Sequence, residues 1–482
     1  MKSALAVDLG SSGVKIILGN LENGKIITQE IYRFSNEPLL IDGALKWNIN
    51  QIFSDIKEGI QKASKILNFQ SIGVDSWGVD FGLIGKEGNL VDIPYSYRDE
   101  RTANIFKSAE KYLSLEELYR YTGNQIMEIN TIFQLLALRE QEPEKYSQTE
   151  KILMIPDLIN YMLTGKSYGE LAICSTTQIL DQYKKSWNQK IIKQFHFDTK
   201  FFPELISPGF SIGTLKKQLC SELGLSKKEV VAVASHDTAC AVVSIPAMEK
   251  ELAYISSGSW SIMGTQLEKP LINAQTYSYN FTNEIGFCGT TRFQKNITGL
   301  WLIQELKRYF INIGKNYNFS DISKIAAENH FIHLFIDPDS ALFLSKGNIK
   351  EKINIYLKQT NQPTTNNDAE IISCVYNSLI LKYRYTIDQM IKILHRDFPK
   401  IYIIGGGIKD SYLCQSIADA LNKTVVAGSS DGTALGNLAV QICREQPQNI
   451  KNIISNSVIK KEYKPKNTAK WDKAYIEYKK YL

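Results

Sequence analysis

Near its start the chain reads Ala6-Val7-Asp8-Leu9-Gly10-Ser11-Ser12-Gly13-Val14-Lys15. An apolar run that contains Asp8 enters a turn of small and hydroxyl residues, and a second apolar run follows the turn. Together with the residues around it, this stretch predicts three strands, at residues 5–9, 14–19 and 25–33, joined by tight turns.

A helix and a further strand are expected next. Asn50 is expected to cap the helix, whose apolar face recurs at Ile52, Ile56 and Ile60, and residues 71–75 read as a short buried strand. Hairpins followed by alternating helix and strand favour a mixed sheet covered by helices. The fold class predicted is therefore α/β.

The opening pattern returns near the middle of the chain. Residues 252–264 again read as strand, hydroxyl-rich glycine turn and strand, although a repeat this short also arises by chance. At 482 residues the chain is long for one domain, and two domains of roughly 240 residues are expected. The sequence predicts one domain at residues 1–247 and another at residues 248–482.

Two strand–glycine–helix junctions lie in the second half. Residues 401–404 run into Gly405-Gly406-Gly407, after which Asp410 or Ser411 caps a helix, and the strand at residues 424–427 runs into a second Gly/Ser turn. Such junctions gather backbone N–H groups and helix N-termini at the sheet edge where open α/β sheets bind nucleotides. A nucleotide-binding edge is predicted here.

The composition is that of an ordinary globular protein, with 44% hydrophobic and 22% charged residues. A net charge of +6 without a concentrated basic patch argues against a nucleic-acid partner, and no apolar run reaches the ~18 residues of a membrane span. The seven cysteines are scattered without CxxC spacing, as in a reduced cytoplasmic protein, and no zinc-like cluster is present. Small molecules are the expected partners, and the oligomeric state stays open.

Asp237 is the candidate catalytic residue. It follows the strand-like run Val231-Ala232-Val233-Ala234, which places its carboxylate at the end of a sheet among small neighbours. As a general base it would take the proton from an attacking hydroxyl, an effect worth ~10²–10⁴-fold in rate, or ~3–5.5 kcal/mol of barrier. The alternative is a helix N-cap, which aspartate also favours, and the two roles are compatible.

Asp8 is the candidate metal ligand. Phosphoryl transfer needs positioned phosphates, a metal ion and a base for the acceptor oxygen. In the turn after Asp8, small residues let backbone donors approach a phosphate, while Ser12 and Lys15 add a hydroxyl and a positive charge. Asp8 would orient Mg²⁺ through water. A plain hairpin turn with an incidental aspartate is the alternative.

Segments along nearly the whole chain resemble the FGGY family of carbohydrate kinases. They are Gly73–Phe81, Tyr97–Thr102, Asn130–Leu135, Pro156-Asp157, Cys174–Gln178, Ala234–Thr238, Ser257–Ser261, Asn296–Trp301 and Gly405–Gly407. The resemblance implies two ribonuclease H-like domains of the actin/hexokinase type around a central cleft. It also implies ATP- and Mg²⁺-dependent phosphorylation of the terminal hydroxyl of a ketose. Within the family, the pattern is most similar to kinases of L-rhamnulose, which form L-rhamnulose 1-phosphate.

The resemblance also implies roles for single residues. Asp237 is implied as the base, and the sugar-binding residues implied are Trp77, Gly78, His236, Thr238 and Asn296. The nucleotide-binding residues implied are Ser11, Ser12, Lys15, Ser259, Gln304, Gly405 and Gly406. For Trp77, packing in the core is an equal alternative to contact with a sugar.

Two departures from the pattern of the L-rhamnulose kinases leave the sugar open. The first turn is one residue shorter and has Lys15 in place of arginine, which loses the planar fork for bidentate phosphate contact, and Ser259 replaces a threonine. L-fuculose and xylulose are therefore alternative substrates. An actin- or chaperone-like ATPase and a catalytically silent sugar-binding regulator are alternatives from other classes. The presence of both Asp8 and Asp237, the candidate metal ligand and base, argues against the silent regulator.

Overall fold

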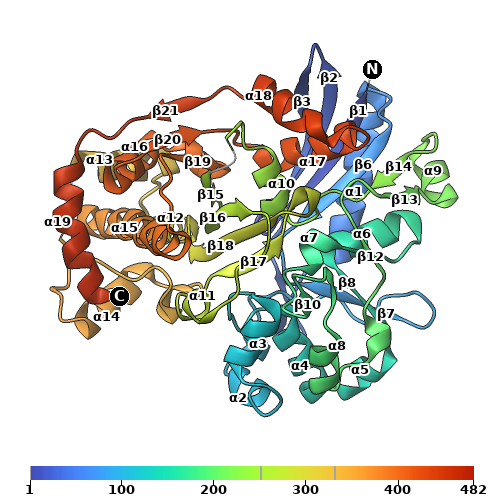
Figure 1. Ribbon diagram of the computed structural model, residues 1–482, viewed down its shortest axis with the longest axis horizontal. Coiled ribbons are helices and arrows are strands. Elements are labelled where there is room, and N and C mark those ends of the chain that lie inside the picture. Colours follow the sequence, from blue (N-terminus) through green and yellow to red (C-terminus); the bar gives the residue numbers. More distant parts are fainter. Residues whose placement is uncertain (1, 250–251, 330–332) are drawn as a thin grey trace. The chain divides into compact units, whose positions relative to one another are not determined.

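The computed structural model describes residues 2–249, 252–329 and 333–482, and the chain divides into two compact units, which we call unit 1 and unit 2 (Figure 1). Unit 1 consists of the chain up to Met248, Gln266–Phe293 and Gly432–Val458. Unit 2 consists of Glu249–Thr265, Gln294–Asp431 and Ile459–Leu482. After residue 248 the chain thus returns to unit 1 twice. The domain assignment at 247/248 stays a prediction.

A six-stranded mixed sheet organises unit 1. In spatial order its strands are β13 (Ser211–Thr214), β14 (Glu229–Val231), β6 (Ser71–Ser76), β1 (Ser3–Gly10), β2 (Gly13–Glu22) and β3 (Lys25–Ser35). The β1, β6 and β14 strands are parallel, whereas β1, β2 and β3 form an antiparallel meander. The three strands predicted at the start of the chain are therefore present, each a few residues longer than expected.

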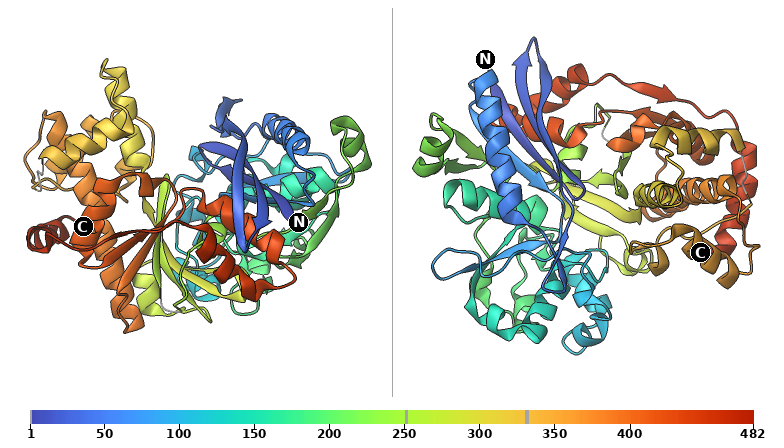
Figure 2. Two further views of the ribbon diagram at one scale, coloured as in Figure 1. Left: turned by 90° about the horizontal axis from the view of Figure 1, so that it is seen from above. Right: turned by 180° about the vertical axis from the view of Figure 1, so that it is seen from behind.

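Helices from opposite ends of the chain cover this sheet. The helix α1 (Ile49–Ile66) begins after Asn48, whose side chain accepts from the backbone N–H of Gln51, so the predicted cap at Asn50 is wrong by two residues. The helices α17 (Gly432–Cys443) and α18 (Ile450–Ser457), drawn in red, lie against the blue strands β1 to β3 (Figure 2). Leu435, Leu438 and Ile442 bury the apolar side of α17 there.

The remaining elements of unit 1 are short helices and strands. Many of them pack around a second apolar core, whereas α10 (Asp237–Val243) packs against α17. The strands are β4 (Leu39–Ile41), β5 (Ala44–Lys46), β7 (Phe81–Gly85), β8 (Thr149–Met154), β9 (Gly169–Glu170), β10 (Leu180–Asp181), β11 (Ser186–Trp187), β12 (Leu205–Ile206) and β17 (Thr282–Ile285). The helices are α2 (Phe106–Ala109), α3 (Leu115–Thr122), α4 (Thr131–Gln141), α5 (Pro143–Gln148), α6 (Ile155–Thr164), α7 (Leu171–Cys174), α8 (Gln189–Gln194), α9 (Lys217–Leu223), α10 (Asp237–Val243) and α11 (Ala274–Ser278).

Unit 2 repeats the hairpin-plus-parallel-strand arrangement. Its strands, in spatial order, are β18 (Thr291–Thr298), β16 (Trp260–Leu267), β15 (Ala253–Ser257), β19 (Lys400–Ile404), β20 (Thr424–Ala427) and β21 (Lys461–Tyr463). As β1 does in unit 1, β15 pairs antiparallel with the next strand and parallel with a later one, here β19. Its helices are α12 (Trp301–Asn312), α13 (Phe319–Asn329), α14 (Ile349–Gln359), α15 (Asp368–Leu394), α16 (Ser411–Leu421) and α19 (Thr468–Tyr478).

Two sequence predictions find their counterparts in unit 2. The strand expected at residues 424–427 is β20, and Asp410 rather than Ser411 caps α16, because its Oδ1 accepts from the N–H of Leu413 at 2.9 Å. In the described part of the chain, no helix combines the length and apolar character that crossing a membrane would require.

Candidate functional site

Two carboxylates lie near the ends of neighbouring strands of unit 1, and a third, that of Asp237, follows the next strand. Asp8 near the end of β1 is in register with Lys15 of β2 on one side and with Asp75 of β6 on the other. Beyond β6, the N–H of Ser76 donates to the backbone oxygen of Ser235 at 2.9 Å, which places the segment leading to Asp237 next along the sheet. Since β1, β6 and β14 are parallel, these ends share one edge of the sheet.

The strand expected before Asp237 is shorter than predicted. It ends at Val231, because the backbone N–H groups that follow donate outside the sheet: that of Ala232 to Phe210, and that of Ser235 to the carboxylate of Glu170 at 2.9 Å. Glu170 is buried and also accepts from the N–H groups of Ala172 and Ile173 at the start of α7. It therefore fixes the backbone two residues before Asp237.

Asp237 is the first residue of α10, and His236 is the N-cap. Oδ1 of Asp237 accepts from the backbone N–H of Thr238 at 2.5 Å and from the hydroxyl of Thr238 at 3.2 Å. Both bonds use Oδ1, and the Asp237 side chain is 31% exposed, whereas Thr238 is buried. A ligand hydroxyl can therefore reach this carboxylate. The predicted alternative, in which Asp237 is the N-cap of the helix, is wrong by one residue, because His236 is the N-cap.

Asp75 is buried beside Asp8. It stands in the segment Gly73–Phe81, but no role was predicted for it. Its Oδ2 accepts from the side-chain N–H of Asn437 on α17 at 2.6 Å, while Oδ1 has no hydrogen-bond partner among the described residues. Burial, and next the negative charge of Asp8, raise the pKa of Asp75. Asn437 in turn is fixed by Gln441, which donates to it at 2.6 Å.

These carboxylates fit a magnesium ion shared with phosphate. Mg²⁺ keeps several waters and takes one or two carboxylates together with phosphate oxygens. Asp8 and the unpartnered Oδ1 of buried Asp75 offer such donors on adjacent strands. Among the residues that the structure describes, no cluster of three or more acidic, histidine or cysteine side chains is arranged to hold a metal by itself.

The predicted phosphate turn joins β1 to β2. Ser11 and Ser12 form its tip, with Ser12 exposed, and Lys15 follows on β2. Gly10 and Gly13 face each other across it, and a Cβ at Gly10 would lie 2.7 Å from the backbone oxygen of Gly13. A side chain at Gly10 would therefore open the turn.

Trp77 and Gly78 follow β6 on the same edge. Trp77 is only 5% exposed; its indole N–H donates to Asp80 at 2.9 Å, and its ring lies 4.3 Å from that of Trp47. Packing thus accounts for most of the Trp77 surface. A Cβ on Gly78 would come within 3.2 Å of the Thr176 side chain.

Val79, next in the chain, has φ of +68°, which is unusual for a β-branched residue. Hydrogen bonds hold it there: its N–H donates to the hydroxyl of Thr176, and its carbonyl accepts from the hydroxyl of Thr131 at 2.7 Å. Strained backbone of this kind is found at ligand sites, where surrounding contacts keep it in place. The positive φ was not predicted.

His236 contacts two buried charged residues that come from a later segment of the chain. Glu284 Oε2 lies 3.1 Å from Nδ1 of His236 and 2.9 Å from Nη2 of Arg292. The other ring nitrogen of His236, Nε2, lies 3.4 Å from Oδ1 of Asp237. Neither Glu284 nor Arg292 stands in a motif that sequence reasoning picked out.

The predicted nucleotide-binding residues of unit 2 form two groups. The Ser259 hydroxyl, in the β15–β16 turn, accepts from the side-chain N–H of Gln304 on α12 at 3.3 Å. Gly405 has φ of +88°, and a Cβ there would lie 2.8 Å from the backbone oxygen of Ser257. Gly406 opens the turn that follows β19. The turns after β15 and β19 therefore lie side by side in unit 2.

The predicted site residues are divided between the two units. Asn296, on β18, belongs to unit 2 together with Ser259, Gln304, Gly405 and Gly406. The other predicted residues belong to unit 1, where the sheet brings Asp8, Lys15 and the His236–Thr238 segment to one edge.

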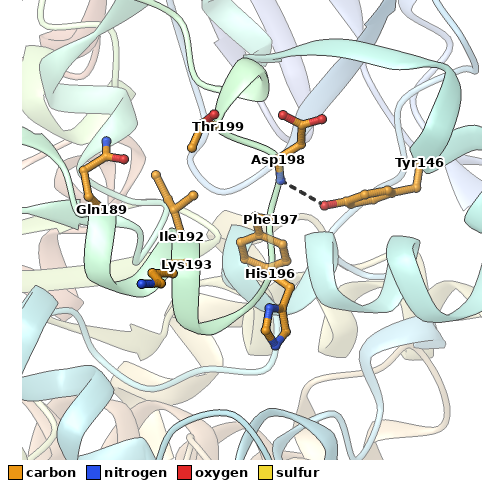
Figure 3. A pocket seen from close by; sticks show the side chains of 8 residues that line it. All are labelled: Tyr146, Gln189, Ile192, Lys193, His196, Phe197, Asp198 and Thr199. Carbon is orange, nitrogen blue, oxygen red and sulfur yellow. Dashed lines mark hydrogen bonds between the residues drawn. The ribbon is translucent and has the colours of Figure 1, made fainter.

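A separate pocket of unit 1 has a volume of about 680 Å³ (Figure 3). Figure 3 shows the hydroxyl of Tyr146 pointing toward the backbone of Asp198, whose N–H donates to it at 3.2 Å. The other lining residues are Gln189, Ile192, Lys193, His196, Phe197 and Thr199. None of the predicted site residues lines this pocket.

Comparison with known proteins gives consistent matches over the whole chain. The models of the N-terminal and C-terminal domains of the FGGY family of carbohydrate kinases match residues 3–244 and 253–444. A rhamnulokinase from Oceanobacillus iheyensis is 40% identical, covering 91% of this chain and 92% of its own. A rhamnulokinase from Bacteroides thetaiotaomicron is 35% identical, covering 98% of both chains.

Solved structures show the same fold at lower identity. A ligand-bound xylulose kinase from Lactobacillus acidophilus superposes with a TM-score of 0.83 at 17% identity, over 99% of this chain and 97% of the other. A glycerol kinase from Plasmodium falciparum with ADP superposes with a TM-score of 0.78 at 14% identity, over 100% and 97%. The two-unit α/β architecture described above is the one these enzymes share.

Proposed function

Because this chain belongs to the FGGY family of carbohydrate kinases, we propose that it uses ATP and Mg²⁺ to phosphorylate L-rhamnulose at its terminal hydroxyl, forming L-rhamnulose 1-phosphate. The relatives named rhamnulokinase support this choice of sugar, since they are 35–40% identical over more than nine-tenths of the chain. The observation that carries the proposal is the accessible Asp237 carboxylate at the sheet edge that also holds Asp8.

In the proposed reaction Asp237 takes the proton of the terminal hydroxyl. The hydroxyl oxygen then forms a bond to the γ-phosphorus of ATP while the bond from that phosphorus to the β–γ bridging oxygen breaks, and ADP leaves. Asp8, with Asp75 beside it, would hold Mg²⁺. Bound Mg²⁺ supplies positive charge that offsets the charge of the transferring phosphoryl group.

The other predicted residues have binding roles in this proposal. The sugar contacts are Gly78, His236, Thr238 and Asn296. Trp77 contributes mainly by packing in the core, because so little of its side chain is exposed. The residues that contact the nucleotide are Ser11, Ser12, Lys15, Ser259, Gln304, Gly405 and Gly406. We keep the division predicted from the sequence as part of the proposal: residues 1–247 bind the sugar and carry the phosphate turn, and residues 248–482 bind the nucleotide and contribute Asn296 to the sugar.

We also assign the reaction to the cytoplasm. The cysteines are free thiols, most of them buried, as expected for a protein in a reducing compartment.

A ketose panel tests the choice of sugar. ADP formation is measured by a coupled assay with L-rhamnulose, L-fuculose and D-xylulose at equal concentrations, with a sugar-free control for hydrolysis. We expect the highest kcat/KM for L-rhamnulose and little ADP without sugar. A higher kcat/KM for another ketose would identify that ketose, rather than L-rhamnulose, as the substrate. ADP formation independent of sugar would contradict kinase activity.

The variant Asp237→Asn tests the base. Asparagine keeps an oxygen for the N–H of Thr238 but is a far weaker base, so kcat should fall by at least ~100-fold with the KM for sugar little changed. Asp368→Asn, in the first turn of α15, is the matched control for loss of a helix-terminal charge. Near-normal turnover of the Asp237 variant would remove the base assignment.

A further inference from the structure

We infer that Asp339, held by Lys382, is a positioning residue that keeps the β15–β16 turn in place for the nucleotide, although Asp339 does not belong to that turn. It acts through residues 298–300, which we call the Thr298 turn. The nucleotide role of the β15–β16 turn rests on the proposed function, but the contacts themselves all lie within unit 2.

The Thr298 turn lies between two predicted site residues. Asn296, near the end of β18, is a predicted sugar contact, and Gln304 on α12 is a predicted nucleotide contact. Because β18 ends at Thr298 and α12 begins at Trp301, this short turn determines how the helix leaves the strand. Its position therefore decides where the side chain of Gln304 lies.

The Thr298 turn packs directly against the β15–β16 turn. The backbone N–H groups of Gly299 and Trp301 donate to the backbone oxygen of Ser259 at 3.2 Å and 3.1 Å. A Cβ at Gly299 would lie 2.5 Å from the backbone nitrogen of Ser261, so the two turns are in contact backbone to backbone. A displacement of one turn therefore displaces the other.

Asp339 contacts the Thr298 turn through a hydrogen bond. Its Oδ1 accepts from the backbone N–H of Thr298 at 2.8 Å, and Thr298 is buried. A bond from an N–H to an ionised carboxylate is stronger than a bond between neutral groups. Loss of the acceptor would leave a buried N–H without a partner, which is costly. The carboxylate thus fixes the backbone at the point where β18 ends.

Lys382 on α15 fixes this carboxylate in turn. Its Nζ lies 2.9 Å from Oδ2 of Asp339 and 2.7 Å from Oδ1 of Asp337, and its side chain is only 6% exposed. Burial disfavours the charge of Lys382, but the carboxylates of Asp339 and Asp337 together outweigh burial and raise the pKa of Lys382. Burial, and next the charge of Lys382, lower the pKa of Lys295 to about 8. Lys382 is therefore the stable positive partner of Asp339.

The segment that carries Asp339 is itself anchored to α15. The N–H of Ile336 donates to the hydroxyl of Ser378 on α15 at 2.9 Å, and the N–H of Asp339 donates to Oδ1 of Asp337 at 3.1 Å. The helix α15 is 27 residues long and largely buried. Asp339 therefore ties the Thr298 turn to a rigid element in the core of unit 2.

Hydrogen exchange followed by mass spectrometry gives a readout that does not depend on activity. In the protein without nucleotide or sugar, the amide hydrogens of residues 298–301 should exchange slowly. In Asp339→Ala they should exchange at least ~10-fold faster, because the loss of the acceptor loosens the whole turn and not Thr298 alone. Fast exchange of these amides in the unaltered protein, or unchanged exchange in the variant, would overturn the inference.

Nucleotide binding connects this contact to the reaction. Calorimetric titration with the non-hydrolysable ATP analogue AMP-PNP, in the presence of Mg²⁺, should give a Kd at least ~10-fold higher for Asp339→Ala. The KM for the preferred ketose of the panel should change less than ~3-fold, because Asn296 lies within β18, which is paired with β17 and β16. Asp339→Asn keeps an oxygen for the N–H of Thr298 but loses the attraction to Lys382, so its Kd should be intermediate.

The variant Asp419→Ala is the matched control. Asp419 is a buried aspartate of unit 2 whose Oδ1 accepts from the backbone N–H of Lys466 at 2.8 Å. This variant loses the same kind of bond at the same distance, and should leave both the exchange of residues 298–301 and the Kd for AMP-PNP unchanged. Equal effects of Asp339→Ala and Asp419→Ala would show a general contribution to stability and refute the positioning role.

The outcomes separate this inference from the proposed function. Binding of AMP-PNP that Asp339→Ala leaves unchanged would overturn the inference alone. An unaltered protein that binds no AMP-PNP would contradict the proposed kinase function, and with it the nucleotide role of the turn. If Asp339→Ala does not fold, the exchange of residues 298–301 in the unaltered protein and the Kd of Asp339→Asn still decide the question.

Discussion

Replacing Glu170 by glutamine should change how the stability of the protein depends on pH. Glu170 is fully buried and accepts hydrogen bonds from the N–H groups of Ala172, Ile173 and Ser235. Burial raises its pKa from 4.5 to about 7, and these three bonds oppose the rise. The neighbouring buried carboxyl of Asp157 has its pKa raised as well, by burial and then by the charge of Glu170.

The magnitude follows from the difference between the folded and unfolded pKa. Because the folded protein binds this proton more tightly than the unfolded chain does, the stabilisation is complete below pH 4.5 and is lost as the pH rises to about 7. At about 1.4 kcal/mol per pKa unit, the loss amounts to roughly 3 kcal/mol. Glutamine does not titrate, so the stability of Glu170→Gln should not show this loss. The free energy of unfolding of the variant should therefore rise by that amount relative to the unaltered protein, mostly between pH 5 and pH 8.

Urea unfolding of both proteins, followed by circular dichroism at several pH values across this range, measures the difference. The control is Glu229→Gln in the same unit: the Arg444 side chain donates to Glu229 and lowers its pKa, so its titration ends below the range scanned. A Glu170 difference that is flat with pH would refute the reasoning. A change of opposite sign would show that the three N–H donors outweigh burial.

Two further substitutions test the site in each unit. Asn437→Ala removes the donor from buried Asp75 and should lower the free energy of unfolding by ~1–3 kcal/mol; a loss under ~0.5 kcal/mol in urea titrations would contradict the importance of this bond. Gly405→Ala forces a side chain onto φ of +88° against the backbone of Ser257, and should cost ~1–3 kcal/mol and raise the KM for ATP with little change in the KM for sugar. Unchanged thermal stability and unchanged KM for ATP would argue against a nucleotide role for this turn.

Local patterns in the sequence predicted the strands and turns well, and contacts between distant segments poorly. The apolar run before Asp8 and the glycine turn after β19 show as strand and turn in any short window. Asn50 was mistaken for the cap because Asn48 and Asn50 have the same propensity, and only the bond from Gln51 distinguishes them. The family resemblance, rather than periodicity, named the sugar and nucleotide residues.

The site residues that were not predicted depend on contacts between distant segments, which no local sequence pattern reveals. Asp75 meets Asn437 across 362 positions of sequence, and His236 meets Arg292 across 56. Taken in isolation, Asp75 is one polar residue in a short strand, and Glu284 and Arg292 are two charges in an unremarkable segment. Their roles follow from burial and from their partners, which only the folded chain supplies.

The return of Gly432–Val458 to unit 1 has a consequence for biosynthesis. On the ribosome, the strands β1 and β6 are made long before α17. The apolar surface that α17 covers therefore stays uncovered until almost the entire polypeptide has been translated. A nascent chain stalled before residue 432 would expose Ala4, Ala6 and Ile17 to aggregation or to chaperones. Splitting the gene product at its midpoint would therefore yield a first fragment that needs the far end of the second one to become soluble.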